Sequence, residues 1–171
     1  MKNWKLTGNP ELRPILEYCL RAGAADRLIL ALRQKNLEGD FLYPATLPAT
    51  ERLFGARILE RRKGRRWPGT VSHRFDCLLV VVRFDEELVT PMVEAGPKLF
   101  DWVGSPKSGL PEDLCLYRAG STWPVLVSVT HEQDAWIFAE EEPSSLEVSA
   151  CESETEELFI PRADVGFIES E

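Results

Sequence analysis

The sequence predicts a single α+β domain spanning residues 1–171: a mostly antiparallel sheet of about five or six strands, an N-terminal helical pair and an inserted helix. Two patterns lead to this fold class. Residues 113–138 place apolar side chains at every second position in three short runs separated by turns, which predicts a β-meander. Residues 9–22 instead repeat apolar side chains at helical spacing. A chain of 171 residues is long enough to bury a sizeable core in one domain.

The N-terminal part of the chain predicts two helices. In residues 9–22, Asn9 is expected to cap the helix, Pro10 occupies its first position, and Gly23 ends it. Residues 24–35 carry four apolar side chains that predict a second helix: Leu28, Leu30, Ala31 and Leu32. We expect the two helices to form a hairpin that packs on the sheet.

The middle of the chain predicts the strands beside the meander. Residues 36–49 contain the breakers Gly39, Pro44 and Pro48 and are expected to be irregular, with no element assigned from residue 50 to 55. Residues 56–62 alternate as a strand, and Gly64 can make a turn back towards the next one. That next strand contains residues 78–82, which are apolar at every position. Such a run is typical of a strand covered on both faces, so we expect it at the centre of the sheet with the meander beside it.

Residues after Phe84 predict the inserted helix. Asp85 is a suitable N-cap for a helix that runs to about Ala95, and a shorter helix is expected over residues 97–103. Residues 139–157 form an acidic, serine-rich excursion with a composition common in mobile segments. Residues 158–168 are apolar again and are expected to dock as a last strand or short helix.

Composition limits the classes of function. The chain has 44% hydrophobic and 28% charged residues, and its longest apolar run is far shorter than the roughly 20 residues that span a bilayer. Its first residues lack the apolar core of a secretory signal, so we expect a cytoplasmic protein without membrane contact. The formal net charge of −8 disfavours general binding to nucleic acid.

The four cysteines predict buried free thiols. They are Cys19, Cys77, Cys115 and Cys151, and no two of them are closer than 36 positions. Zinc knuckles and redox dithiols need much closer spacing. The sequence therefore predicts no metal site and no cofactor.

The weak candidates for catalysis are His131 and Asp134, which lie in a predicted turn of the meander. A histidine beside a carboxylate can act as a general base, which leaves a small hydrolase or transferase as one hypothesis. A cysteine paired with His131 across the sheet is another arrangement of the same kind. No nucleophile elbow, phosphate loop or dinucleotide fingerprint is present, so the sequence favours a non-enzymatic function.

A basic hairpin over residues 57–67 suggests a second hypothesis, a nucleic-acid-associated accessory protein. Arginines would grip phosphates while a tryptophan stacks on a base. The residues of this alternative are Arg61, Arg62, Lys63, Arg65, Arg66 and Trp67. The same hairpin could instead pair with the chain's own acidic segment.

Our preferred hypothesis is a protein-interaction module that binds a basic protein partner or forms part of a larger assembly. From Glu140 onwards the chain is strongly acidic, with Arg162 as its one basic residue, and Trp123 sits beside Pro124 as a potential anchor. The expected partner-binding residues are Trp123, Glu140, Glu141, Glu142, Glu152, Glu154, Glu156 and Glu157. In composition the chain resembles small acidic α+β immunity or inhibitor proteins that neutralise bacterial toxins. This resemblance implies a similar inhibitory role.

Overall fold

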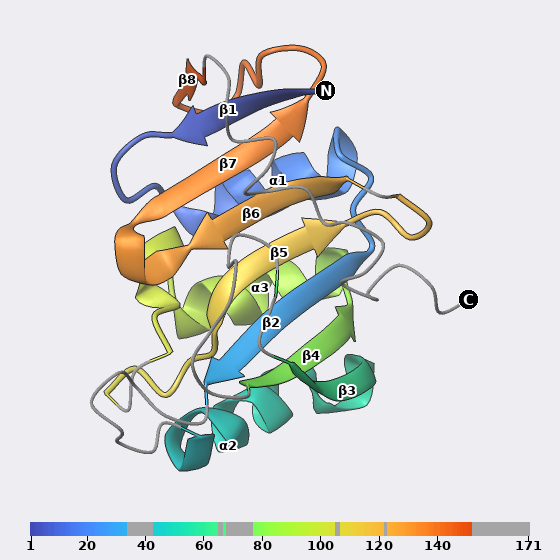
Figure 1. Cartoon of the computed structure of the whole chain (residues 1–171), viewed down its shortest axis with the longest axis vertical. Coiled ribbons are helices and arrows are strands. Elements are labelled where there is room, and N and C mark those ends of the chain that lie inside the picture. Colours follow the sequence, from blue (N-terminus) through green and yellow to red (C-terminus); the bar gives the residue numbers. More distant parts are fainter. Residues whose placement is uncertain (34–42, 65–66, 68–76, 105–106, 122, 152–171) are drawn as a thin grey trace.

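The computed structural model is an eight-stranded sheet with helices packed on one face (Figure 1). It describes residues 1–33, 43–64, 67, 77–104, 107–121 and 123–151. The strands follow the order β3-β4-β2-β5-β6-β7-β1-β8, and every described pairing is antiparallel. Their bounds are β1 Lys2–Leu6, β2 Arg27–Arg33, β3 Ile58–Gly64, β4 Cys77–Arg83, β5 Glu112–Tyr117, β6 Pro124–Val129, β7 Asp134–Ala139 and β8 Val148–Ala150. The predicted α+β class and antiparallel sheet are confirmed, but the expected five or six strands are too few.

The helical face of the sheet is covered by α1 (Leu12–Arg21) and α3 (Glu86–Ala95), which contact each other (Figure 1). The predicted helix after Asp85 is confirmed, with Asp85 as its N-cap. The first helix begins later than predicted, because its N-cap is Glu11 rather than Asn9. The Asn9 side-chain oxygen instead accepts a hydrogen bond from the Phe100 amide at 3.0 Å. The short helix expected over residues 97–103 is only a 3₁₀ turn, η2 (Leu99–Asp101).

The predicted helix over residues 24–35 is wrong, because Arg27–Arg33 forms strand β2 between β4 and β5. Leu28, Leu30 and Leu32 join the core beneath the helices, whereas Ile29 and Ala31 belong to apolar clusters separate from that core. A strand buried on both faces has apolar side chains at successive positions. It therefore lacks the apolar–polar alternation that marks a strand with one solvent-exposed face. The predicted helical hairpin therefore does not exist.

Strand β4 has the predicted burial but not the predicted position. Leu79 to Val82 are all buried, yet β4 is second from the edge, with β3 on one side and β2 on the other. The β5-β6-β7 meander is confirmed, although β2 separates it from β4. A further helix, α2 (Tyr43–Phe54), covers residues for which the sequence predicted irregular structure or no element.

The acidic segment begins as ordered structure. After β7, residues 140–147 lead into β8, which pairs with β1 and places Val148 opposite Leu6 and Ala150 opposite Trp4. Residues 152–157, and the apolar stretch expected to dock at 158–168, lie outside the described residues. Among the described residues, no helix has both the length and the apolar character needed to cross a membrane.

Candidate functional site

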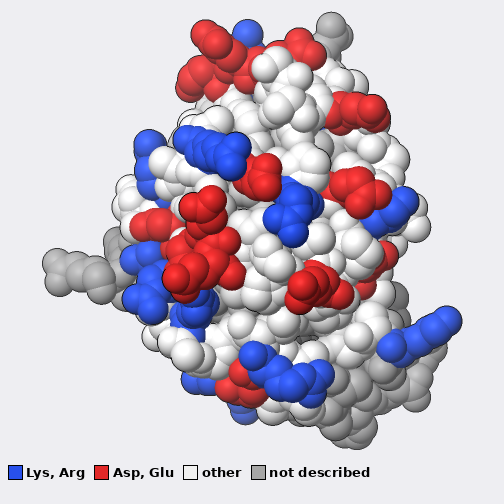
Figure 2. Space-filling model, turned by 180° about the vertical axis from the view of Figure 1, so that it is seen from behind, with Lys and Arg blue, Asp and Glu red and all other residues white. Residues whose placement is uncertain are grey.

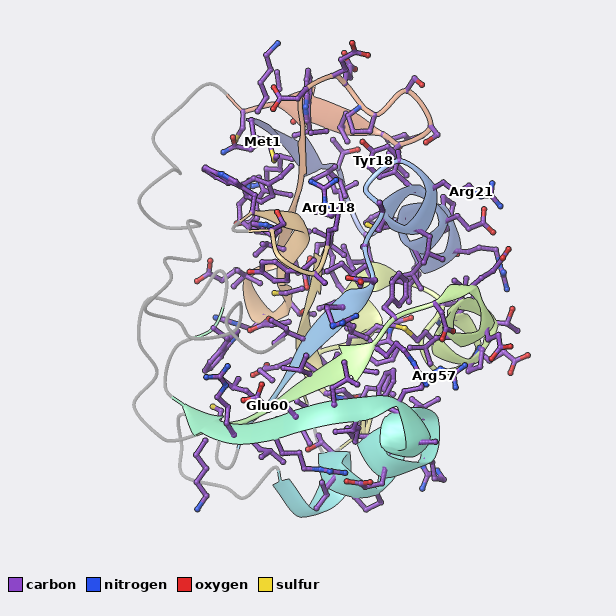
Figure 3. The ribbon with its side chains drawn as sticks, turned by 90° about the vertical axis from the view of Figure 1, so that its right-hand side faces the viewer. Met1, Tyr18, Arg21, Arg57, Glu60 and Arg118 are labelled. Atoms are coloured by element: carbon purple, nitrogen blue, oxygen red, sulfur yellow. The ribbon has the colours of Figure 1, made fainter. Side chains whose placement is uncertain are left out.

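A hollow of about 480 Å³ lies at the end of the sheet where β5 turns into β6 and where β7 ends. We call it the Trp123 hollow. Its wall includes Met1, Tyr18 of α1 and Arg118 of the β5–β6 turn, which lie close together on one side of the molecule (Figure 3). Trp123 and Glu140, Glu141 and Glu142 also line it. Segments distant in the sequence therefore meet around one concave surface.

The β5–β6 turn fixes the position of Trp123. Gly120 adopts a left-handed conformation with φ 75°, which glycine tolerates without strain. The Ser121 hydroxyl accepts a hydrogen bond from the Trp123 amide at 3.1 Å and donates one to the Trp123 carbonyl at 3.0 Å. The half-buried indole packs against Phe138 of β7, with ring centroids 6.2 Å apart. Trp123 therefore needs little reordering to bind a partner, as in a preorganised interface.

The three glutamates follow β7 directly. Glu140, Glu141 and Glu142 are exposed, while the next residue, Pro143, is buried and holds the segment against the body of the protein. Two positive groups also line the hollow: Arg118, and the Met1 amino group, which is 3.7 Å from a Glu140 carboxylate oxygen. Among the described residues that line the hollow, three carboxylates against these two cations leave negative charge in excess. Of the residues expected to bind a partner, four converge here, and Glu152, Glu154, Glu156 and Glu157 lie outside the described residues.

The described arginines of the basic hairpin are engaged with acidic groups of the same chain. Arg61 contacts Glu51 at 2.7 Å, and Arg62 contacts Glu60 at 3.1 Å. Arg57, at the start of this region (Figure 3), binds Asp85 and Glu87 at 3.2 and 2.6 Å, and these hydrogen bonds raise its pKa. Lys63 is exposed, and Arg65 and Arg66 lie outside the described residues. Acidic and basic side chains are also interspersed over the helical face of the protein rather than gathered by sign (Figure 2).

Trp67 is buried, so the expectation that it is exposed to stack on a base is wrong. Its side chain is 2% exposed, and its indole Nε1 donates a hydrogen bond of 2.7 Å to Asp113 Oδ2. A tryptophan in this position stabilises the fold and presents no ring face to a nucleic acid.

The second candidate site is a carboxylate–histidine cluster formed by Glu112, Asp113 and His131. One potential ligand atom from each of the three lies within 4.8 Å of the others. Glu112 and Asp113 are each 1% exposed, and the His131 side chain is 45% exposed. His131 belongs to η3 (Thr130–Glu132), a short 3₁₀ turn between β6 and β7. This cluster lies at the opposite end of β5 and β6 from the Trp123 hollow.

Sequence reasoning found His131 but not its buried neighbours. It grouped His131 with Glu132 and Asp134. Glu132 Oε1 does lie 3.7 Å from His131 Nε2, but the Asp134 carboxylate forms a salt bridge with Lys5 of β1. The Lys5 ammonium also lies 5.7 Å from the centre of the Trp136 ring. Glu112 and Asp113 were overlooked because alternation places adjacent strand residues on opposite faces.

The predicted buried free thiols are confirmed at Cys19, Cys77 and Cys115, and Cys151 is a half-buried free thiol. Burial raises the pKa of the Cys19 thiol. Burial, and then the charge of Asp113, raise the pKa of the Cys115 thiol. Because the thiolate is the nucleophile, neither group is prepared for catalysis at neutral pH.

Comparison with family models, with curated proteins and with solved structures finds no match to this chain.

Proposed function

We propose that the chain is a non-enzymatic cytoplasmic interaction protein that binds a basic segment of a protein partner at the Trp123 hollow. The observation that carries this proposal is the convergence of Trp123 with Glu140, Glu141 and Glu142 around one concave surface. Trp123 lies in the turn between β5 and β6, and the three glutamates follow the end of β7, so both lie outside regular strands.

The hollow suits a lysine or arginine side chain of the partner. The aliphatic stem of such a side chain would pack on the Trp123 ring, where a cation–π contact contributes about 0.5–2 kcal/mol. Its charged head would then reach the glutamates at the rim. Tryptophan is favoured as an energetic anchor at interfaces, and acidic residues around it speed association with a basic partner.

An inhibitor or immunity-like role follows from the same chemistry. A protein of net charge −8 can cover a basic surface, and a toxin or enzyme that acts on a polyanion commonly carries such a surface. The partner would be blocked by occupation of its basic site, with no chemical step on this chain. If the chain instead forms part of a larger assembly, the Trp123 hollow would contact a basic surface of a neighbouring subunit in the same way.

The test is capture from a host lysate with and without nuclease, using three forms of the chain. One is wild type, the second carries E140Q, E141Q and E142Q, and the third carries the control changes E17Q, E86Q and E94Q. The control set removes the same formal charge from exposed or half-buried glutamates of α1 and α3.

The proposal predicts a discrete basic protein that survives nuclease, is lost with the hollow variant and is retained by the control variant. A second variant, Trp123→Ala, should weaken binding of that purified partner at least tenfold by calorimetry, about 1.4 kcal/mol. Capture that is equal for all three forms, or retention of nucleic acid alone, would refute it.

The two other hypotheses have weaker support. Nucleic-acid binding is less well supported because Trp67 is buried and cannot stack on a base. In addition, Arg57, Arg61 and Arg62 already contact acidic groups of the same chain. A hydrolase or transferase at His131 gains two neighbouring carboxylates, but the thiol of Cys115 is 0% exposed and has a raised pKa. These carboxylates are better suited to a different ligand.

A further inference from the structure

Two buried carboxylates and one exposed imidazole converge where β5 begins. Glu112 and Asp113 start β5, and His131 reaches the same point from η3. Carboxylate oxygens and imidazole nitrogens are the ligands that divalent transition metals take from proteins. The cluster therefore combines two chemical types of ligand from two elements of the fold.

A β-bulge brings the two carboxylates to the same side of the strand. Adjacent residues of a regular strand point to opposite faces. In the β2–β5 pairing, however, Ile29 faces Cys115 while Ala31 faces Glu112, so β5 contains one extra residue at this point. Asp113 absorbs it with a left-handed backbone, φ 56°. Bulges commonly redirect a side chain next to a functional site.

Asp113 is held in place as a metal-ligating carboxylate would be. Its Oδ1 accepts a hydrogen bond from the Thr130 amide at 2.8 Å, and its Oδ2 accepts one from the Trp67 indole at 2.7 Å. Each oxygen of an ionised carboxylate has two lone pairs, so one accepted hydrogen bond does not by itself prevent metal ligation. Ligating carboxylates in metal sites are usually oriented by hydrogen bonds of this kind.

Gly104 makes room for the second carboxylate. A Cβ atom at this position would lie 2.9 Å from Glu112 Oε2, closer than such atoms approach. The Glu112 carboxylate can therefore occupy its place in the cluster only because residue 104 has no side chain.

We propose that Glu112, Asp113 and His131 bind one divalent transition-metal ion of the Zn²⁺ or Mn²⁺ class. Ligand atoms around a tetrahedral ion lie about 3.4 Å apart when each bond is about 2.1 Å. Separations of up to 4.8 Å therefore need to contract by at most about 1.4 Å, and the exposed His131 side chain can move towards the two carboxylates. Imidazole ligation disfavours Mg²⁺ and Ca²⁺, which prefer oxygen. Solvent reaches the site from the His131 side and can fill the other coordination positions.

This metal site is independent of the Trp123 hollow, and its test uses the metals alone. The full chain, first stripped with a chelator, is titrated with Zn²⁺, Mn²⁺ and Mg²⁺ by calorimetry. Co²⁺ absorption reports the ligand type, because thiolate ligation gives an intense charge-transfer band and oxygen and nitrogen ligation does not. The variants are His131→Ala and Glu112→Gln. The controls are Glu94→Gln, an exposed carboxylate of α3, and His73→Ala, which removes the other histidine.

We expect one equivalent of Zn²⁺ or Mn²⁺ to bind wild type, without a cobalt–thiolate band, and Mg²⁺ to bind much more weakly. His131→Ala should weaken binding by at least about tenfold and abolish the metal-induced rise in Tm, whereas both controls should behave as wild type. Because His131 is exposed, this variant is expected to fold even if Glu112→Gln does not. No stoichiometric binding, or equal binding by His131→Ala, would refute the metal site.

Discussion

Trp67 and Asp113 are 46 positions apart in the sequence and share a buried hydrogen bond of 2.7 Å between the indole nitrogen and a carboxylate oxygen. The bond connects Trp67 to Asp113 in the first strand of the meander, β5. The Thr130 amide donates a second hydrogen bond, of 2.8 Å, to the same carboxylate.

Removal of this donor should destabilise the protein. Trp67→Phe keeps most of the apolar volume but leaves a buried carboxylate oxygen with one donor fewer, so we expect the free energy of unfolding to fall by about 1–3 kcal/mol. Urea denaturation measures the change. The matched control is Trp123→Phe at the half-buried indole of the hollow, expected to change stability by under about 1 kcal/mol. Equal effects of the two substitutions would contradict the role of the bond.

Comparing Gly104 with Gly120 separates two costs of adding a side chain: steric overlap with a neighbour, and strain from the positive φ angle. Gly104 and Gly120 both have positive φ, 61° and 75°, but a Cβ on Gly104 would meet Glu112 while one on Gly120 would meet nothing within 4 Å. Gly120→Ala should therefore lose about 1–2 kcal/mol from backbone strain alone. Gly104→Ala should lose about 1–3 kcal/mol more from overpacking. Thermal unfolding of both variants tests this order, and a smaller loss at Gly104 would be inconsistent with the close contact.

The thiols should differ in reactivity. Cys19, Cys77 and Cys115 are buried, and Cys151 is half-buried. Alkylation of the native protein near pH 8, followed by mass spectrometry, should therefore modify Cys151 first and the other three only after denaturant is added. Rapid native labelling of Cys115 would show that the region around Asp113 opens more often than its burial indicates.

Stability should decline in alkaline solution. Burial raises the pKa of the Cys19 and Cys115 thiols, so they keep their protons at a pH where unfolded thiols have lost theirs, above about 8.5. The folded state then binds more protons, and the free energy of unfolding falls by up to about 1.4 kcal/mol per pH unit for each thiol. Denaturation between pH 7 and 10 measures this slope.

A double variant, Cys19→Ala with Cys115→Ala, provides the control for that slope. It should flatten the decline between pH 8.5 and 10, because no buried thiol remains at these positions. The phenol of Tyr117, whose pKa is also raised mainly by burial, should still cause a loss above about pH 10. An unchanged slope in the double variant would assign the alkaline decline to other groups.

Local patterns in the sequence predicted those elements that have one distinctive local signal. The meander was found because its strands alternate, and α3 because Asp85 at the N-cap position is followed by two glutamates and an apolar helical face. Strand β2 was missed because its apolar side chains are continuous rather than alternating, since residues on both of its faces are buried in the tertiary fold. The cluster at His131 was half found, since the bulge at Asp113 results from pairing with β2 and leaves no mark in the local sequence.

The position of β1 in the sheet has a consequence for how the chain acquires its structure. Strand β1 contains residues 2–6, yet its two partners, β7 and β8, contain residues 134–139 and 148–150. During synthesis the first strand therefore waits until nearly all of the described chain has left the ribosome. The β5-β6-β7 meander closes through short turns and can form from local contacts alone. Closure of long loops slows folding, so we expect the pairing of β1 with β7 and β8 to form last. Until it forms, the unpaired strand edges at this end of the sheet are the ones most exposed to aggregation.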